Sequence, residues 1–216
     1  MAEVNRRTAL IVVDMQPDFM EGGPLATEDG SAIIPGIRAL MLSGQYTDIV
    51  ATQDWHPAGH VSFANSHDAE PFTVTQLYGH DQVLWPDHCV QTTPGAELHA
   101  DLPWEMASVI IRKGEDPWVD SYSGFANNWD AAGERPPTGL AGWLRERGIT
   151  AVDCCGLARD YCVKWTAEDA VAMGFETRFL WDLTRPVDSN ADTDVRTALD
   201  QAGVGVIRGD GRTQPS

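Results

Sequence analysis

Cys162 is the residue whose type and position most directly suggest chemistry in this sequence. It follows the strand-like run Ile149–Leu157 and begins a helix-like run that ends at Gly174. A cysteine attacks as its thiolate, and the free thiol has a pKa near ~8.5. Helix N-termini and nearby cations both stabilise a thiolate. We therefore expect a lowered pKa for Cys162, with Lys113 as a candidate cation.

Polar or reactive residues stand at the ends of four predicted strands. Asp14 ends the first strand, Asp54 the second and Lys113 the third, and Cys162 follows the fourth. In a parallel sheet these carboxyl ends lie along one edge, where ligands bind. A single polar strand end is commonly only hydrogen-bonded or solvated, but four on one edge favour a reactive site.

The types of these residues suit attack on an amide carbonyl. Asp14 can accept the proton of the Cys162 thiol and deliver it to a leaving amine, while Lys113 stabilises the thiolate. Backbone N–H groups in the segment that leads to Cys162 can supply an oxyanion hole.

A second group of residues can bind a metal ion. Asp54, His56 and His60 lie within seven residues of one another, and His88 lies further along the chain. A carboxylate with imidazoles suits a divalent ion such as Zn²⁺, Fe²⁺ or Mn²⁺. The Asp-x-His spacing is weak evidence by itself, because loop histidines are often surface residues. Three further histidines are expected to be such surface residues: His67, His80 and His99.

The other three cysteines are expected to be structural. Cys154 and Cys155 lie inside an apolar strand-like run, which favours buried and inert thiols. Cys89 stands next to His88 and is a minor candidate for a soft metal ligand. Four cysteines in a chain of 216 residues do not form a disulfide scaffold.

The elements that must position these residues alternate between strands and helices. Apolar, β-branched runs predict strands at Thr8–Met15, Asp48–Trp55, Ser108–Gly114, Ile149–Leu157, Glu176–Leu183 and Gly203–Gly209. Amphipathic segments predict helices at Ile34–Gly44, Gly139–Gly148, Cys162–Gly174 and Asn190–Gly203, the last with Asn190 or Asp192 as its N-cap. This alternation predicts an α/β protein, a three-layer α/β/α fold with a six-stranded, mainly parallel sheet.

The length of the chain predicts a single domain over residues 1–216. Two connections, at about 54–106 and 114–138, are too long for simple crossovers. Loops of that length in a compact domain are usually functional, so we expect active-site insertions there.

The charge of the chain excludes some partners. The formal net charge is −17 and the sequence pI is near 4.5, which argues against nucleic acid and anionic membrane surfaces. The sequence holds no apolar run of 18 residues, and its first apolar stretch ends at Asp14, too early for a signal peptide. We expect a cytoplasmic protein. Whether it forms a homo-oligomer is left open by the sequence.

Six blocks occur in a characteristic order over about Ala9–Leu183: ALIVVDMQPDFMEGGPLA, ATQDWHPAGHVSFA, LWPDHCVQTTPGAELH, IIRKG, SYSGF and GLARDYCVKWTAEDA. Together they resemble the nicotinamidase/pyrazinamidase family, within the isochorismatase-like hydrolases. The resemblance implies an isochorismatase-like hydrolase fold and a hydrolase acting on linear amide C–N bonds. Such an enzyme converts nicotinamide or pyrazinamide to nicotinate or pyrazinoate and ammonia. It works through a cysteine acyl-enzyme and serves NAD salvage.

The resemblance also implies roles for individual residues. Asp14 falls on the general acid/base, Lys113 on the catalytic lysine and Cys162 on the nucleophile. The backbone amides of Ala158 and Cys162 fall on the oxyanion hole, next to a cis peptide between Leu157 and Ala158.

The implied cofactor is one divalent metal ion, with zinc favoured over iron and manganese. Its ligands fall on Asp54, His56 and His88, with His60 as an additional histidine of some members. In the family this metal meets the pyridine nitrogen of the substrate. The implied substrate contacts are Phe19, Trp85 and Tyr122, which flank the ring, and Leu157.

Two residues depart from the family pattern. Arg159 stands where Thr or Ser is usual, and Gly59 where Asp or Asn is common. The segment 115–137 is variable in the family and can reshape the pocket mouth. Isochorismatases proper lack this cysteine and this metal set, which argues against an ether hydrolase. Two alternatives remain, namely a sister amidase acting on another small amide and a non-catalytic binding protein of the same fold.

Overall fold

The computed structural model describes residues 7–208 and 212–213, so both ends of the predicted domain lie outside the described residues. Its main sheet has seven strands in the order β5-β2-β1-β6-β7-β8-β9. In chain order the strands are β1 (Thr8–Val13), β2 (Asp48–Asp54), β5 (Val109–Lys113), β6 (Ala151–Leu157), β7 (Glu176–Arg185), β8 (Gly205–Arg208) and β9 (Arg212–Thr213). All neighbours from β5 to β8 are parallel, which confirms the predicted six-stranded parallel sheet, and the short β9 adds an antiparallel edge.

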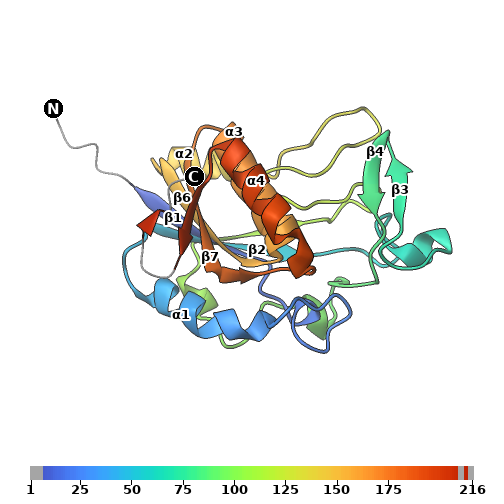
Figure 1. Cartoon of the computed structure of the whole chain (residues 1–216), viewed down its shortest axis with the longest axis horizontal. Coiled ribbons are helices and arrows are strands. Elements are labelled where there is room, and N and C mark those ends of the chain that lie inside the picture. The colour runs from blue at the N-terminus through green and yellow to red at the C-terminus, as the bar shows by residue number, and fades with distance from the viewer. Residues whose placement is uncertain (1–6, 209–211, 214–216) are drawn as a thin grey trace.

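Helices cover both faces of this sheet (Figure 1). One face packs against α1 (Ile34–Leu42), and the other packs against α2 (Leu140–Glu146), α3 (Lys164–Ala172) and α4 (Asp192–Ala202). Alternating residues of β1 divide between the two cores. Ile11 joins the core under α2, α3 and α4, whereas Leu10 joins the core over α1. The result is the predicted three-layer α/β/α arrangement.

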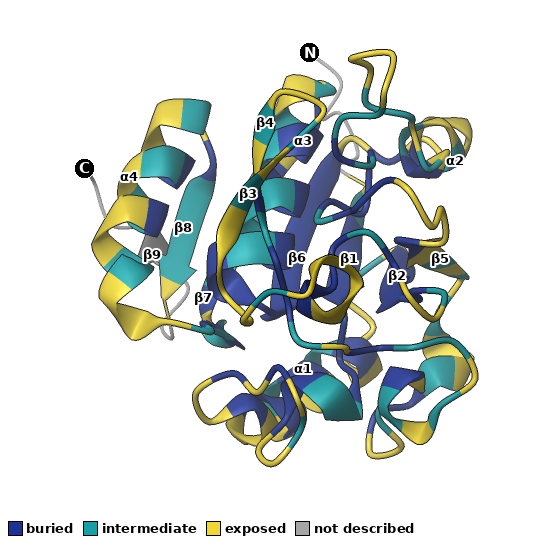
Figure 2. Cartoon of the chain, turned by 90° about the vertical axis from the view of Figure 1, so that its right-hand side faces the viewer, coloured by how far each residue is buried: buried dark blue, intermediate teal, exposed yellow. Residues whose placement is uncertain are grey.

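The three central strands are almost completely buried. Every residue of β2 and β6 is buried, as are five of the six residues of β1 (Figure 2). Strand β7 instead alternates between buried and more exposed positions, and in β5 half-buried and exposed residues alternate up to the buried Lys113. A strand covered on both faces needs an almost continuous apolar run. For this reason β1 and β6 could be predicted from the sequence.

Two helix starts differ from the predictions. The predicted N-cap of α4 at Asn190 or Asp192 is wrong, because Asp188 caps the short helix η7 (Ser189–Ala191) just before it, accepting from the backbone N of Asn190 at 3.0 Å. Asp192 instead accepts hydrogen bonds from Arg159. Helix α3 begins at Lys164, after a wide helical turn, η6 (Arg159–Val163), that contains Cys162.

The two long connections differ in their secondary structure, which the sequence did not predict. The first contains a two-stranded antiparallel hairpin, β3 (Val74–Leu77) and β4 (His80–Val83), which projects from one end of the sheet (Figure 1). The second, from Lys113 to Leu140, holds neither a helix nor a strand. The remaining elements are short 3₁₀ turns: η1 (Pro17–Phe19), η2 (Gly30–Ile33), η3 (Ala64–His67), η4 (Pro94–Ala96) and η5 (Trp104–Met106). Within the part of the chain that is described, no helix is both long and apolar enough to cross a membrane.

Candidate active site

The carboxyl ends of three strands bring the predicted reactive side chains together. The Lys113 Nζ atom lies 2.9 Å from Asp14 Oδ2 and 3.5 Å from the Sγ atom of Cys162. Asp14 follows β1, Lys113 ends β5, and Cys162 lies in the turn after β6. All three residues are at most 6% exposed. This buried group can therefore supply a nucleophile, a cation and a proton acceptor.

Local constraints hold Asp14 in place. Its backbone has a φ of 45°, a left-handed conformation that is strained for a residue other than glycine. Thr52 supports it twice: its Oγ1 donates to Asp14 Oδ1 at 2.6 Å and accepts from the Asp14 backbone N at 3.1 Å. On β6, a Cβ added to Gly156 would lie 2.1 Å from the Val13 carbonyl oxygen. The close approach of β6 to the end of β1 therefore requires glycine at position 156.

Lys113 is shared between two carboxylates. Its Nζ atom lies 2.9 Å from Asp54 Oδ1 as well as from Asp14. Burial alone would lower the pKa of Lys113, but the two negative charges raise that pKa well above its usual value. Burial raises the pKa of Asp54, yet the charges of His56 and Lys113 hold it well below the usual range. Lys113 and Asp54 are therefore a charged pair that joins the reactive group to the histidines.

The predicted low pKa of Cys162 is wrong. Burial raises the pKa of this thiol well above its usual value, and the opposing effect of Lys113 does not offset burial and the charges of Asp14 and Asp54. Burial also raises the pKa of Asp14, against the opposing charge of Lys113. A carboxylate with a raised pKa is a stronger proton acceptor. The resting Cys162 is therefore a neutral thiol beside a base that can take its proton.

Three of the four residues predicted as metal ligands converge. Asp54, His56 and His88 offer ligand atoms that all lie within 4.8 Å of one another. Asp54 Oδ2 is 3.1 Å from His56 Nε2 and 3.3 Å from His88 Nε2. The Nδ1 atoms face carbonyl oxygens, that of Gly114 at 3.1 Å and that of Pro86 at 2.8 Å. A proton on each Nδ1 leaves both Nε2 atoms free to bind a metal, so the donor set fits a divalent ion.

Backbone pairing explains how His88 reaches the end of β2. The backbone N of His56 donates to the Cys89 carbonyl at 3.0 Å, and the N of Gln91 donates back to the His56 carbonyl at 2.8 Å. The insertion thus adds a short parallel bridge beyond β2. Gly114 leaves room for His56, because a Cβ at Gly114 would lie 2.4 Å from the imidazole Cε1. These contacts join parts of the chain that are far apart in sequence.

His60 lies beside the group rather than within it. Its ring stacks obliquely on His56, with centroids 4.2 Å apart. Its Nδ1 faces Ser62 Oγ at 2.8 Å and its Nε2 faces the Asp116 carbonyl at 2.9 Å. Burial and the charge of His56 lower the pKa of His60 to about 4. A second group of potential ligand atoms comprises His56, His60 and Asp120, so a ligand role for His60 stays a prediction.

The remaining candidates lie away from the reactive group. Cys154 and Cys155 are fully buried in β6, and burial raises the pKa of both thiols. Cys89 is also fully buried, and it belongs to neither of the ligand groups found among the described residues. Away from the site, His67 is exposed, and His80 and His99 are half-buried.

Cys162 lines an open cavity whose empty volume, with the part open to solvent included, is about 330 Å³. The predicted substrate contacts Phe19, Trp85 and Tyr122 line it, together with the metal group and Ala158. Leu157 is completely buried and is not among the residues that line this cavity, so its substrate contact stays a prediction. The peptide between Leu157 and Ala158 is cis, as the resemblance implied.

Aromatic rings close the cavity on one side. Trp85 meets Tyr161 edge to face, with centroids 4.7 Å apart, and its Nε1 donates to the Tyr122 hydroxyl at 3.2 Å. Tyr161 was not predicted, although it precedes Cys162 directly and only the turn geometry of η6 directs it to the cavity. Other cavity residues that sequence reasoning missed are Leu25, Asp120, Ser121 and Val187.

Sequence reasoning missed one supporting residue, Gln16, and gave no role to another, Arg159. The Gln16 side chain pairs with the Asp54 backbone, donating to its carbonyl and accepting from its N, both at 2.8 Å. Arg159 is buried and donates to Thr184 and Asp192 while lying over the Trp181 ring. Arg159 therefore ties the turn that carries Cys162 to β7 and α4.

Known proteins resemble this chain along most of its length. The isochorismatase domain family matches residues 8–210. The nicotinamidase of Acinetobacter baylyi is 47% identical over 183 residues, covering 84% of this chain and 83% of the relative. The nicotinamidase of Escherichia coli is 40% identical over 199 residues, covering 91% of this chain and 92% of the relative.

Solved structures agree with the sequence relatives. The nicotinamidase/pyrazinamidase of Acinetobacter baumanii superposes with a TM-score of 0.88 and 43% identity, over 95% of this chain and 98% of that one. PnC1 from L. infantum in complex with nicotinate has a TM-score of 0.82 and 39% identity, over 95% and 94% of the two chains. The pyrazinamidase of Pyrococcus horikoshii in complex with zinc has a TM-score of 0.76 and 37% identity, over 94% and 99%.

Proposed function

Because this chain belongs to the isochorismatase family and is a hydrolase that acts on amides, we propose that it converts nicotinamide, and its analogue pyrazinamide, to nicotinate or pyrazinoate and ammonia. The observation that supports this best is the position of Cys162. Its thiol lines a cavity, with Lys113 and Asp14 packed behind it and a carboxylate–imidazole group on another wall. We further propose that the nicotinate formed serves NAD salvage.

The first half of the reaction forms an acyl-enzyme. Asp14 takes the proton from the Cys162 thiol as the sulfur attacks the carboxamide carbon. The carbonyl oxygen becomes negative and is held by the backbone amides of Ala158 and Cys162, both of which line the cavity. Asp14 then gives the proton to the amide nitrogen, the C–N bond breaks, and ammonia leaves a thioester on Cys162.

The second half hydrolyses the thioester. A water molecule attacks the carbonyl carbon while Asp14 accepts one of its protons. Collapse of the tetrahedral intermediate breaks the C–S bond and returns the proton from Asp14 to the Cys162 sulfur. The product leaves as the carboxylic acid, which becomes nicotinate by giving its proton to the released ammonia or to solvent. Lys113 stays charged throughout because Asp14 and Asp54 raise its pKa, so it can stabilise the sulfur whenever that atom carries negative charge.

Asp54, His56 and His88 are the residues that would hold the divalent ion, and zinc is favoured because a zinc complex is known for the Pyrococcus horikoshii relative. When bound, this ion supplies a Lewis-acid contact for the pyridine nitrogen of the substrate. Phe19, Trp85 and Tyr122 would flank the ring, so that the carboxamide faces Cys162. Correct orientation of a reacting group contributes several orders of magnitude in rate.

The test is ammonia release from nicotinamide by the purified protein, with metal content measured by elemental analysis on the same sample. Benzamide serves as the matched substrate, because it has the shape of nicotinamide without the ring nitrogen. We expect fast nicotinamide turnover, bound metal and poor turnover of benzamide. Equal rates on both amides would favour a sister amidase, and the absence of turnover on either would favour a binding protein.

A further inference from the structure

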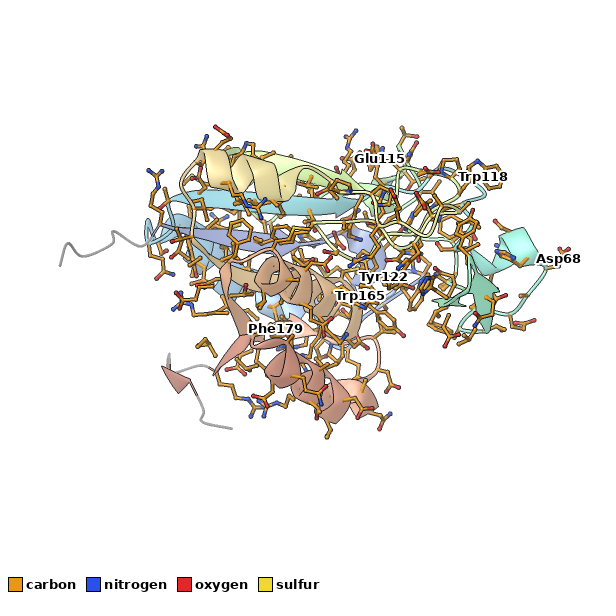
Figure 3. The ribbon with its side chains drawn as sticks, turned by 90° about the horizontal axis from the view of Figure 1, so that it is seen from above. Asp68, Glu115, Trp118, Tyr122, Trp165 and Phe179 are labelled. Carbon is orange, nitrogen blue, oxygen red and sulfur yellow. The ribbon has the colours of Figure 1, made fainter. Side chains whose placement is uncertain are left out.

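The active-site cavity reaches towards solvent at three of its lining residues. Tyr122, Tyr161 and Val187 are half-buried, whereas the other described residues that line the cavity are buried. The two tyrosine rings meet with centroids 5.6 Å apart, and Figure 3 shows Tyr122 beside Trp165 at the start of α3. These three half-buried side chains form the mouth of the cavity, through which a substrate approaches Cys162.

Val187 is the aliphatic residue of this mouth. It lies in the connection between β7 and α4, and within the described segment 186–191 it is the residue that lines the cavity. Its side chain packs against the core that contains Leu25, which also lines the cavity. A β-branched side chain is stiff about χ1, so the position of the Val187 backbone fixes the position of its methyl groups.

Asp160 holds the backbone of this segment through its carboxylate. Its Oδ1 accepts from the backbone N of Val187 and its Oδ2 from that of Asp188, both at 3.0 Å. The residue is 8% exposed, and burial raises the pKa of its carboxyl, while the two backbone N–H groups oppose that shift. Hydrogen bonds to a carboxylate are stronger than neutral ones, so both oxygens anchor the segment firmly.

The turn η6 joins this anchor to the reactive residue. It places three residues in succession: Asp160 holds the segment, Tyr161 lines the mouth, and Cys162 carries the thiol. Asp160 therefore connects the two sides of the mouth directly, the turn on one side and the Val187 backbone on the other.

Arg159, the residue before Asp160, holds the two ends of the same connection. Its guanidinium donates to the Thr184 carbonyl at 2.8 Å, near the end of β7, and to the Asp192 carboxylate at 2.8 Å, where α4 begins. Since Asp160 holds the middle and Arg159 the ends, the connection is bound to the turn along its length.

We infer that Asp160 is a positioning residue that sets the width of the cavity mouth, because it ties the Val187 backbone to the turn that carries Tyr161 and Cys162. Val187 is then the residue that limits the size of the acyl group that reaches the thiol. The inference takes from the proposed function only that Cys162 is the reacting group, and it holds for any amide that the site hydrolyses.

The test compares two thiol reagents of different size on Cys162, namely iodoacetamide and its larger N-phenyl derivative, iodoacetanilide. Both react with the same thiolate, so a change in the pKa of Cys162 cancels in the ratio of the two rates. Mass spectrometry locates the label, and Cys162→Ala supplies the background rate. The ratio of the iodoacetanilide rate to the iodoacetamide rate therefore reports access to the thiol and not its reactivity.

Val187 is changed in both directions. Val187→Ala removes two methyl groups from the mouth, and we expect the ratio to rise about tenfold, the usual scale for one methylene in an apolar site. Val187→Leu adds one methylene, so the ratio should fall.

Asp160→Asn keeps the shape of the side chain, but its amide nitrogen cannot accept from a backbone N–H. One of the two hydrogen bonds to the segment is lost, so we expect the ratio to rise several-fold. Hydrogen exchange at the amides of Val187 and Asp188 should become faster in the same variant. In the Val187→Ala background, Asp160→Asn should raise the ratio no further, because Asp160 acts through Val187.

Asp169→Asn is the matched control for Asp160→Asn. Asp169 is also a buried carboxylate, 9% exposed, but it lies in α3 and does not line the cavity. The ratio in this variant should equal that of the wild type.

An unchanged ratio in Val187→Ala and Val187→Leu would overturn the proposal, and so would an equal effect of Asp160→Asn with valine or alanine at position 187. The expected ratios in a protein that releases no ammonia from nicotinamide would support the role of Asp160 and Val187 while contradicting the proposed function.

Discussion

The active site combines two regions of different origin, the sheet edge and the insertions. Asp14, Lys113 and Cys162 stand on or directly after strands of the buried sheet. His88, Trp85 and Tyr122 come from connections that run far from those strands. The sheet edge is fixed by strand register, such as the pairing of Asp54 with Lys113. The insertion residues depend instead on bridges such as the one between His56 and Val90.

This difference separates chemistry from recognition. The residues that we propose to make and break bonds lie on the most buried part of the molecule, where small displacements are resisted by packing. The residues that we propose to contact the ring lie on connections that evolution can vary without disturbing the sheet. Asp54 belongs to both regions, because one oxygen meets Lys113 and the other faces the two histidines.

The largest expected effect comes from the sheet edge. Asp14→Asn keeps the shape of the side chain but removes the proton acceptor next to Cys162. We expect kcat for nicotinamide to fall about 10²–10⁴-fold, the usual loss when an acid–base group is removed. Metal content should stay at the wild-type value because Asp14 is not among the converging ligands. Activity within a few-fold of wild type would mean that another group moves the proton.

The variant that tests the recognition residues most specifically is His88→Ala. Asp54→Ala would disturb both regions, because Asp54 Oδ1 also meets Lys113 Nζ at 2.9 Å. His88→Ala removes a ligand without touching Lys113, so we expect loss of bound metal and about 10²-fold or more lower kcat/KM for nicotinamide. Alkylation of Cys162 by iodoacetamide should continue at the wild-type rate.

The matched control for His88 is His67→Ala. His67 is exposed, and its Nε2 faces the Val61 carbonyl oxygen at 2.7 Å. It should keep both metal and activity. Metal retention in His88→Ala, measured by elemental analysis, would contradict the ligand assignment.

The residues at the sheet edge could be predicted from sequence, because apolar, β-branched runs locate the strands and the ends of those runs locate the polar residues. The apolar runs that form β1, β2, β5 and β6 end at or shortly before the residues that meet. The burial of Cys162 could not be predicted in the same way. Its environment depends on Asp14, Asp54 and the surrounding core together, and this is why the expected lowering of its pKa was wrong.

The sequence predicted where the two insertions lie but not the structure that they adopt. Their length indicated function, yet nothing local predicted the β3–β4 hairpin or the bridge that brings His88 to His56. The partners of that bridge, His56 and Val90, are separated by more than 30 residues, and their register follows from tertiary packing. Only the resemblance to a known family pointed to Trp85 and Tyr122, and it did not point to Tyr161.

A smaller effect is expected where the two regions touch, at Gly114. Gly114→Ala would place a Cβ 2.4 Å from His56 Cε1 and would put alanine at a φ of +68°. Displacement of a metal-binding imidazole typically lowers metal affinity about 10–100-fold. Gly44→Ala is the matched control, because it has a φ of +70° and open space around its Cβ. Both variants should lose about 1–2 kcal/mol of unfolding free energy from backbone strain.

Only Gly114→Ala should bind metal more weakly, measured by competition with a chelator. Equal metal affinity in the two glycine variants would show that His56 tolerates displacement.

The last prediction concerns the sheet-edge side of the comparison, namely whether Cys162 is ionised before substrate binds. Burial raises the pKa of Cys162 above its ordinary value, so below that pKa the thiolate fraction increases with rising pH. The rate of alkylation by iodoacetamide should therefore rise about tenfold per pH unit from pH 6 to 9, without a plateau. Mass spectrometry should place the label on Cys162, because Cys154 and Cys155 are 0% exposed and their thiols also have raised pKa values. Cys162→Ala supplies the background rate of the other thiols. A plateau below pH 8 would mean that Lys113 outweighs burial and that the thiolate is already formed in the resting enzyme.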